Sequence, residues 1–127
     1  MLGDKSAAAT IAVKDLAQAK KFYEEKLGLS PQGGVDGGGQ IYKSGDSMIF
    51  IYESQFAGTN KATAASFGVG DDLDKIVEDL ASKGVEFEKY DNIPEVKREG
   101  NIHVSGEMRA AWFKDPDGNI LNLVNKM

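Results

Sequence analysis

The sequence contains one pattern twice, and this internal repeat constrains the fold more than any other feature. Residues 11–16 (Ile-Ala-Val-Lys-Asp-Leu) are echoed by residues 67–73 (Phe-Gly-Val-Gly-Asp-Asp-Leu). The spacing between the copies is 56 residues at the valines (13 and 69), 57 at the leucines (16 and 73) and 56 again at the glycines (28 and 84). A nearly constant period across a chain of 127 residues indicates two copies of one supersecondary unit.

Each copy predicts a strand that leads into an amphipathic helix. In the first copy, apolar residues recur at steps of three and four, which places them on one helix face. They are Leu16, Ala19, Tyr23 and Leu27. The second helix has its apolar face at Leu73, Ile76, Val77 and Leu80. We expect Asp15 and either Asp71 or Asp72 to cap the amino ends, and Gly28 and Gly84 to end the helices in the left-handed conformation.

Short strand-like segments follow each helix and are separated by turn residues. They lie at residues 29–35, 40–43 and 48–53 in the first copy and at 85–88, 108–113 and 119–125 in the second. The sequence Asp-Pro-Asp-Gly at residues 115–118 predicts a tight hairpin, because proline fixes φ and glycine accepts a positive φ. Each copy is therefore a β-α-β-β-β unit. A unit of about 60 residues buries too little apolar surface to be stable alone, so we expect the two to pair their sheets.

The order, spacing and duplication of these segments resemble the vicinal oxygen chelate superfamily, which includes glyoxalases, bleomycin resistance proteins and dioxygenases. The resemblance covers nearly the whole chain. Its carriers are residues 13–16, 22–23 and 27–29 in the first copy and residues 72–73, 83–85 and 112–119 in the second.

Membership of this superfamily would imply an α+β fold. Two paired β-α-β-β-β modules would form a curved, mostly antiparallel eight-stranded sheet, with helices on one side and a ligand cleft on the other. We expect a single domain over residues 1–127, with one module at about 6–56, the other at about 61–127 and a short linker at 58–60.

Composition excludes several classes of function. Fifteen basic and twenty acidic residues give a net charge of −5, which argues against a nucleic-acid surface. The chain has no cysteine, which excludes disulfides, thiolate nucleophiles and zinc–sulfur sites. No apolar run approaches the roughly 20 residues that span a bilayer, and no segment resembles a signal peptide. We therefore expect a cytoplasmic protein that binds neither nucleic acid nor membrane.

The resemblance also indicates where a metal would bind in metal-dependent members: four side chains, two from each unit, usually His, Glu or Gln. In this sequence the corresponding positions fall at Ala8, at Ala64 or Ala65, at Asn122 and near Phe50. Methyl and phenyl groups donate no electron pair to an ion, and divalent metals need several nitrogen or oxygen donors. We expect no metal and no other cofactor, which favours a binding protein over a metal-dependent enzyme.

The chain has one histidine, His103, in the polar stretch 97–106, which we expect to be a loop beside the cleft. One interpretation is a solvated loop histidine. The other is a general acid or base, or a ligand contact, acting with Glu107 or Glu99. A single histidine without a spaced partner leaves both open.

Alternation along the strands sorts the side chains between the helix face and the cleft face. Ile11, Val13, Phe67 and Val69 should face the helices, together with Phe22 and Phe113. The cleft side would then carry small residues, at Ala8, Thr10, Ala12, Ala64, Ser66 and Gly68. These small residues could leave room for a ligand or could allow the two units to pack closely, and both explanations remain open.

Aromatic and polar side chains on the expected cleft face, together with the histidine of the loop beside it, form the candidate binding site. They are Phe50, Tyr52, Ser66, Trp112, Asn122 and His103. Trp112 and Tyr52 have rings suited to stacking on a planar ligand, whereas each aromatic taken singly is better explained by core packing. Glu53 could select a cationic ligand or could be a solvated acid at a strand end. Arg109 should lie on the face opposite Trp112, in a structural or interfacial role.

The glycine-rich residues 33–39 lack the Gly-Lys-Ser/Thr sequence of a phosphate loop, so we expect a flexible hairpin connection that could cover the cleft. The sequence thus favours a metal-independent protein that binds a planar small molecule as a homodimer, and one interpretation of Glu53 makes that ligand cationic. The alternative is a glyoxalase-like lyase or dioxygenase with a divalent metal at a non-standard site. A third possibility is that the paired units serve assembly alone.

Overall fold

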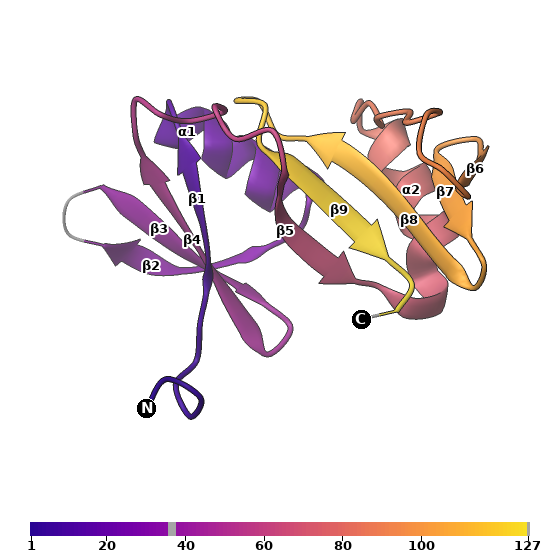
Figure 1. Cartoon of the computed structure of the whole chain (residues 1–127). Coiled ribbons are helices and arrows are strands. Elements are labelled where there is room, and N and C mark those ends of the chain that lie inside the picture. Colours follow the sequence, from indigo (N-terminus) through magenta and orange to yellow (C-terminus); the bar gives the residue numbers. More distant parts are fainter. Residues whose placement is uncertain (36–37, 127) are drawn as a thin grey trace. The chain divides into compact units, whose positions relative to one another are not determined.

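A computed structural model describes residues 1–35 and 38–126, and within them it shows an α+β structure with two mixed β-sheets (Figure 1). The chain divides into two units, Met1–Thr59 and Asn60–Met127. One sheet, of four strands, belongs to the first unit, and the other, of five strands, belongs to the second. The described residues thus form nine strands, one more than expected.

The first unit contains β1 (Ala9–Val13), α1 (Leu16–Lys20), a π-helical turn (Lys21–Lys26), β2 (Ser30–Val35), β3 (Gly39–Ser44) and β4 (Ser47–Glu53). The strand order is β1-β4-β3-β2, with β1 parallel to β4 and the other pairs antiparallel. One face of this sheet is apolar and buried. Its members include Ile11, Val13, Tyr42, Ile49 and Ile51.

The predicted first helix forms, but it changes type halfway. Asp15 caps it as expected, because its Oδ1 accepts hydrogen bonds from the backbone N–H groups of Ala17 (2.9 Å) and Gln18 (3.4 Å). In the π-helical turn, the N–H of Leu27 donates to the carbonyl five residues earlier, at Phe22. This wider turn buries two consecutive aromatic residues, Phe22 and Tyr23.

The second unit contains β5 (Thr63–Gly68), a 3-10 turn (Gly70–Asp72), α2 (Leu73–Ser82), β6 (Lys97–Glu99), β7 (Ile102–Ser105), β8 (Met108–Lys114) and β9 (Ile120–Val124). The strand order is β5-β9-β8-β7-β6, with β5 parallel to β9. Buried residues of α2 are Leu73, Val77 and Leu80, and buried residues of the sheet include Ala111, Phe113, Leu121 and Leu123.

Both predicted turns at glycines after the helices are present. Gly28 and Gly84 have φ values of 72° and 88°, in the left-handed region. The hairpin at residues 115–118 also forms between β8 and β9. There, the carboxylate of Asp115 accepts from the N–H groups of Asp117 and Asn119, each at 2.9 Å.

Three expectations for the second unit are wrong in detail. The stretch 97–106 is the hairpin β6–β7, closed by Gly100 at φ 64°, and not a loop. The segment 85–88 forms only an isolated bridge, Phe87 to Phe113, with the Glu88 N–H bonded to the Trp112 carbonyl. Neither Asp71 nor Asp72 caps α2, because a 3-10 turn begins it and the Asp72 side chain makes no capping bond.

The glycine-rich connection expected at residues 33–39 is described only at its two ends. Residues 33–35 belong to β2 and Gly39 to β3, whereas residues 36 and 37 lie outside the described part of the chain. No helix among the described residues is long and apolar enough to cross a membrane.

Candidate functional site

Four of the expected binding residues lie on one face of the second unit's sheet. Ser66 pairs with Asn122, and Asn122 pairs with Trp112 on its other side. Residues paired directly across strands project to the same side. His103 pairs with Ala110, two residues before Trp112, and therefore shares this face as well. The opposite face carries the buried residues Phe113 and Leu121 beside them in sequence.

Three rings on this face form an aromatic cluster: Tyr90, His103 and Trp112. The His103 ring stands nearly perpendicular to Trp112, with centroids 5.0 Å apart and an interplanar angle of 86°. Tyr90 meets Trp112 edge to face at 5.5 Å and lies 5.6 Å from His103. Edge-to-face contacts of this kind fix ring orientations, so the half-buried Trp112 has a defined position on the sheet.

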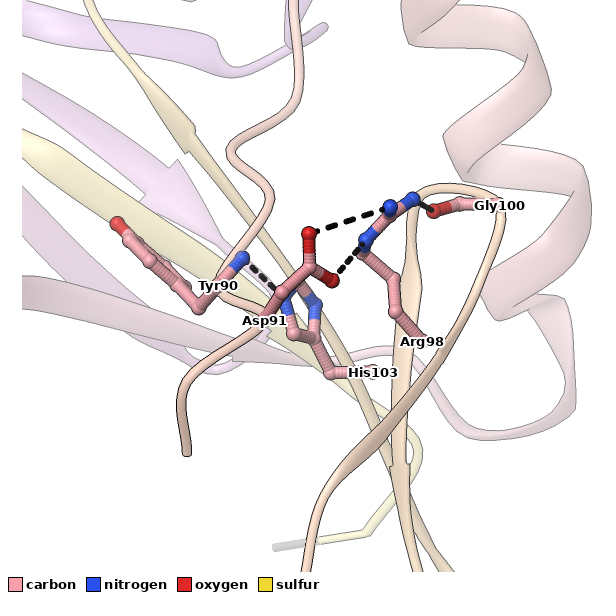
Figure 2. A network of polar contacts seen from close by, with 5 residues as sticks. All are labelled: Tyr90, Asp91, Arg98, Gly100 and His103. Carbon is pink, nitrogen blue, oxygen red and sulfur yellow. Dashed lines mark hydrogen bonds and ion pairs between the residues drawn. The ribbon is translucent and has the colours of Figure 1, made fainter. Parts of the chain in front are cut away.

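His103 is not the solvated loop histidine that one interpretation predicted. It lies in β7 and is 2% exposed. Its Nε2 accepts a hydrogen bond of 2.9 Å from the backbone N–H of Tyr90 (Figure 2). Because Nε2 is the acceptor, the neutral ring carries its proton on Nδ1. This atom is buried, and in the described structure no acceptor meets the distance and angle of a hydrogen bond to it.

The surroundings of His103 favour the neutral imidazole. Burial is the largest effect and lowers the pKa of His103, and the nearby Arg98 cation lowers it further. The Ala110 carbonyl and the Asp91 carboxylate act in the opposite direction. No hydrogen bond or ion pair within residues 1–35 and 38–126 joins His103 to Glu99 or Glu107. Neither glutamate is therefore a partner of this ring, and Asp91, the carboxylate whose charge acts on it, is engaged by Arg98.

A second set of contacts ties residues 90–91 to the hairpin β6–β7. The Arg98 Nε donates to Asp91 Oδ1 at 2.7 Å, and its second terminal nitrogen lies 3.4 Å from Oδ2. The other terminal nitrogen donates to the Gly100 carbonyl at 2.6 Å (Figure 2). The guanidinium lowers the pKa of Asp91. Tyr90 and Asp91 are thus held at successive positions, one through its backbone and one through its side chain.

Beside the aromatic cluster is a hollow of about 560 Å³, within the usual size of a small-molecule site. Strands contribute Thr63, Trp112 and Ile120 to its lining. The indole Nε1 of Trp112 donates to Thr63 Oγ1 at 3.2 Å. The remaining lining comes from two chain segments, residues 61–62 and residues 89–93. We call this the Trp112 hollow.

Most of the lining of the Trp112 hollow could not be identified from the sequence. Of the expected binding residues, Trp112 alone lines it. Residues 89–93 have no sequence motif, and they reach the hollow because a buried histidine and an arginine on β6–β7 hold them there. The nearest available signal was the isolated aromatic Tyr90 in a polar segment, which does not by itself indicate a site.

Phe50 and Tyr52 belong to the first unit, where they form a stacked pair. Their rings are nearly parallel, at an interplanar angle of 6° and a centroid distance of 5.7 Å. Phe50 lies over Gly39, since a Cβ added there would meet its ring at 2.5 Å. Strand register places Thr10 and Ala12 beside this pair, as expected. That Phe50 and Tyr52 bind ligand stays a prediction.

Two charged residues have local structural partners. Glu53 accepts a hydrogen bond from the N–H of Leu16 at 3.0 Å, so its carboxylate stabilises the amino end of α1. Arg109 forms a two-point ion pair with Asp74 of α2, at 2.8 and 2.9 Å. The structural interpretation of Arg109 fits this geometry.

The positions at which the resemblance leads us to expect metal ligands carry few donor atoms. Alanine side chains stand at 8, 64 and 65, and a phenyl ring at 50. Among them Asn122 alone has an oxygen donor, and its Oδ1 is buried without a hydrogen-bond partner in the described structure. Within residues 1–35 and 38–126, no three His, Cys, Asp or Glu side chains lie close enough to share an ion. One amide oxygen is too few for a divalent metal.

Comparison with known proteins agrees with this architecture. The chain belongs to the Glyoxalase/Bleomycin resistance protein/Dioxygenase superfamily, whose family model matches residues 5–123. No curated protein matches the sequence.

Solved structures share the fold at low sequence identity. The fosfomycin resistance protein FosX from Listeria monocytogenes is 20% identical, with 98% of this chain and 93% of that chain covered and a TM-score of 0.74. Integron cassette protein HFX_CASS4, from the Halifax Harbour sewage outfall metagenome, is 22% identical, with 94% and 97% covered and a TM-score of 0.70. A glyoxalase family protein from Bacillus anthracis is 19% identical, with both chains fully covered and a TM-score of 0.68.

Proposed function

We propose that this protein binds a planar small molecule in the Trp112 hollow and does so without a metal ion. The observation that carries the proposal is the indole of Trp112, half-buried at the lining of a hollow of about 560 Å³. An aromatic surface of fixed orientation provides a stacking platform whose side-chain entropy is already reduced, which favours a flat ligand.

The polar groups on this face of the sheet support the same function. Ser66 and Asn122 lie in the same cross-strand row as Trp112 but do not line the hollow, so they remain proposed ligand contacts, and the buried Oδ1 of Asn122 is an acceptor without a donor in the described structure. Small-molecule sites typically combine apolar and aromatic walls with a few such groups that fix orientation. Phe50 and Tyr52 of the first unit remain proposed ligand contacts.

Metal independence is supported by the residue types at the family's ligand positions. Alanine at 8, 64 and 65 and phenylalanine at 50 leave Asn122 as the single donor. A protein built on this superfamily's fold can therefore keep the binding function while lacking the means to hold an ion. A glyoxalase-like lyase or dioxygenase would need a metal held elsewhere.

The binding proposal is tested by titration of the protein with planar aromatic compounds. The chain has one tryptophan, so intrinsic indole fluorescence reports directly on Trp112. Calorimetry measures the same affinity without a probe. We expect at least one flat compound to bind with a change in Trp112 fluorescence. A broad panel in which no compound binds or raises the melting temperature would contradict the binding function and favour a role in assembly.

Replacement of Trp112 isolates its contribution. Trp112→Ala should weaken binding by ~1–3 kcal/mol if the ring is an anchor. Phe56→Ala is the matched control, because Phe56 is an aromatic residue that is 67% exposed and does not line the hollow. Unchanged affinity in Trp112→Ala, measured by calorimetry, would contradict the proposed site.

We further propose that the protein is a cytoplasmic homodimer, in keeping with the paired-unit assembly that the resemblance implies. Light scattering after size exclusion should then give twice the chain mass of 13.7 kDa. A mass of one chain across the micromolar range would contradict the dimer.

A further inference from the structure

We propose that the ligand of the Trp112 hollow is an aromatic anion, whose negative group is held by Lys61 and Lys89. This inference rests on the proposed function, because it assigns a charge to the ligand of that same site. It follows from the charged residues that line the hollow and from the ion pairs in which they do, or do not, take part.

Three charged side chains line the hollow: Lys61, Lys89 and Asp91. The carboxylate of Asp91 is engaged by the Arg98 guanidinium, through the 2.7 Å contact at Nε and the 3.4 Å contact at the terminal nitrogen. That pairing also lowers the pKa of Asp91. Its negative charge is therefore balanced by a cation that does not itself line the hollow.

The two lysines are not balanced in this way. Neither Lys61 nor Lys89 forms an ion pair within residues 1–35 and 38–126, although Lys89 contributes to the field at Asp91. Taken together, Lys61, Lys89, Arg98 and Asp91 carry a net charge of about +2, since Lys and Arg are protonated and Asp ionised at neutral pH. The chain as a whole carries −5, so the hollow has the opposite sign to the molecule.

A positive rim beside an apolar and aromatic wall matches an amphiphilic anion. The flat part of such a ligand would contact Trp112, with Ile93 and Ile120 as apolar neighbours. Its carboxylate would lie among the exposed ammonium groups of the two lysines, where an anion is attracted by unpaired positive charge. The Asn92 side chain lines the same hollow and can donate a hydrogen bond.

This assignment replaces the sequence-based suggestion of a cationic ligand. That suggestion depended on Glu53 and on the acidic net charge. Glu53 lies in the first unit, where its carboxylate accepts from the Leu16 N–H, and it does not line the hollow. The charged residues that line the Trp112 hollow therefore determine the sign of the charge that we assign to the ligand.

The test compares three probes with one aromatic body and different charges: 2-naphthoate, 2-naphthalenemethanol and 2-naphthylmethylammonium. Calorimetry at low ionic strength should show that naphthoate binds about fivefold more tightly than the neutral alcohol, the effect of two exposed charge contacts, and that the ammonium compound binds most weakly. The preference should shrink as salt rises toward 1 M, because exposed charges are screened.

Replacement of the two lysines then tests whether they are the groups that attract the anion. The double variant Lys61→Gln/Lys89→Gln should lose the preference for naphthoate and keep the affinity for the alcohol. The control Lys43→Gln/Lys75→Gln removes the same charge at two exposed lysines that do not line the hollow, and should keep the preference.

Each other outcome has a distinct meaning. Equal binding of the three probes, or tightest binding of the ammonium compound, would overturn the anion assignment while the binding function stands. A naphthoate preference that survives in Lys61→Gln/Lys89→Gln would overturn the role of these two lysines. If none of the probes bind, and no other flat compound does, the proposed function itself fails.

Discussion

At the scale of single residues, the burial of His103 makes a hydrogen bond of the fold depend on pH. Its ring is 2% exposed, and its Nε2 accepts from the Tyr90 N–H, a bond that the protonated ring cannot accept. Residues 89–93 line the Trp112 hollow, so the protonation state of one histidine bears on the position of that wall.

The burial of His103 predicts the direction of a pH effect on stability. Its pKa in the folded protein is lowered from the ordinary value of 6.5. Between the folded and unfolded pKa values the unfolded chain binds more protons, so the free energy of unfolding should fall as pH drops below about 6.5, by at most about 1.4 kcal/mol per pH unit. Below the pKa of the folded protein both states bind the proton, and the stability that the neutral ring contributed at higher pH is fully lost.

His103→Gln, which keeps an acceptor without a titrating ring, should flatten this dependence between about pH 5 and 7. Urea denaturation at several pH values measures it. Asp74 and Asp91 also have shifted pKa values, but theirs are lowered below 3.8 and contribute only at more acidic pH. An unchanged slope in His103→Gln over pH 5–7 would show that the histidine is not the group responsible.

The role of His103 was the residue-scale feature that the sequence could not reveal. The surrounding stretch 97–106 is mostly polar, and burial comes from the segment around Tyr90 and from Trp112, thirteen residues before it and nine after. Trp112 and Asn122, by contrast, were placed on one face by alternation alone, and the strand register confirms that arrangement.

At the scale of elements, the two helices begin in different ways and provide a matched pair of variants. Asp15 accepts hydrogen bonds from two N–H groups of α1, whereas Asp72 makes no capping bond to α2. Asp15→Ala should therefore lower the free energy of unfolding by about 1 kcal/mol. Asp72→Ala should change it by less than about 0.5 kcal/mol. Equal losses in urea denaturation would contradict the assigned caps.

The segment 85–96 is an element whose order depends on a few contacts. Arg98→Ala removes both nitrogens that engage Asp91 and the donor to the Gly100 carbonyl. We expect faster amide hydrogen exchange in residues 89–93, measured by mass spectrometry, because this anchor is lost. Arg109→Ala, which breaks an ion pair to α2, should leave that segment unchanged. Equal exchange in both variants would show that Arg98 does not hold the wall.

Helices and hairpins with a strong local signal were predictable, and elements that depend on distant contacts were not. Periodicity and Asp15 located the first helix, but the change to a π-helical turn at Lys21–Lys26 has no local signature in the sequence. The hairpin β6–β7 was missed because its strands are short, because β6 is largely exposed, and because neither strand shows a long apolar alternation. The bridge at Phe87 is brief because the following residues turn toward His103.

At the scale of the whole molecule, the internal repeat predicted the superfamily fold, and the family match over residues 5–123 confirms it. Each unit carries a parallel pairing of its first and last strands, β1 with β4 and β5 with β9. The two copies differ in their side chains. The first unit carries the stacked pair Phe50 and Tyr52, and the second unit carries the Trp112 hollow. Repetition specified the scaffold, and individual side chains specify the site.

The central claim is that the Trp112 hollow binds its ligand without a metal. Its most direct test is one calorimetric titration with a flat aromatic compound, performed on protein as purified and again after exhaustive dialysis against a chelator, with elemental analysis of both samples. We predict the same affinity in both samples and no stoichiometric transition metal in either. One metal per chain, together with binding that disappears on chelation and returns with the metal, would contradict the account.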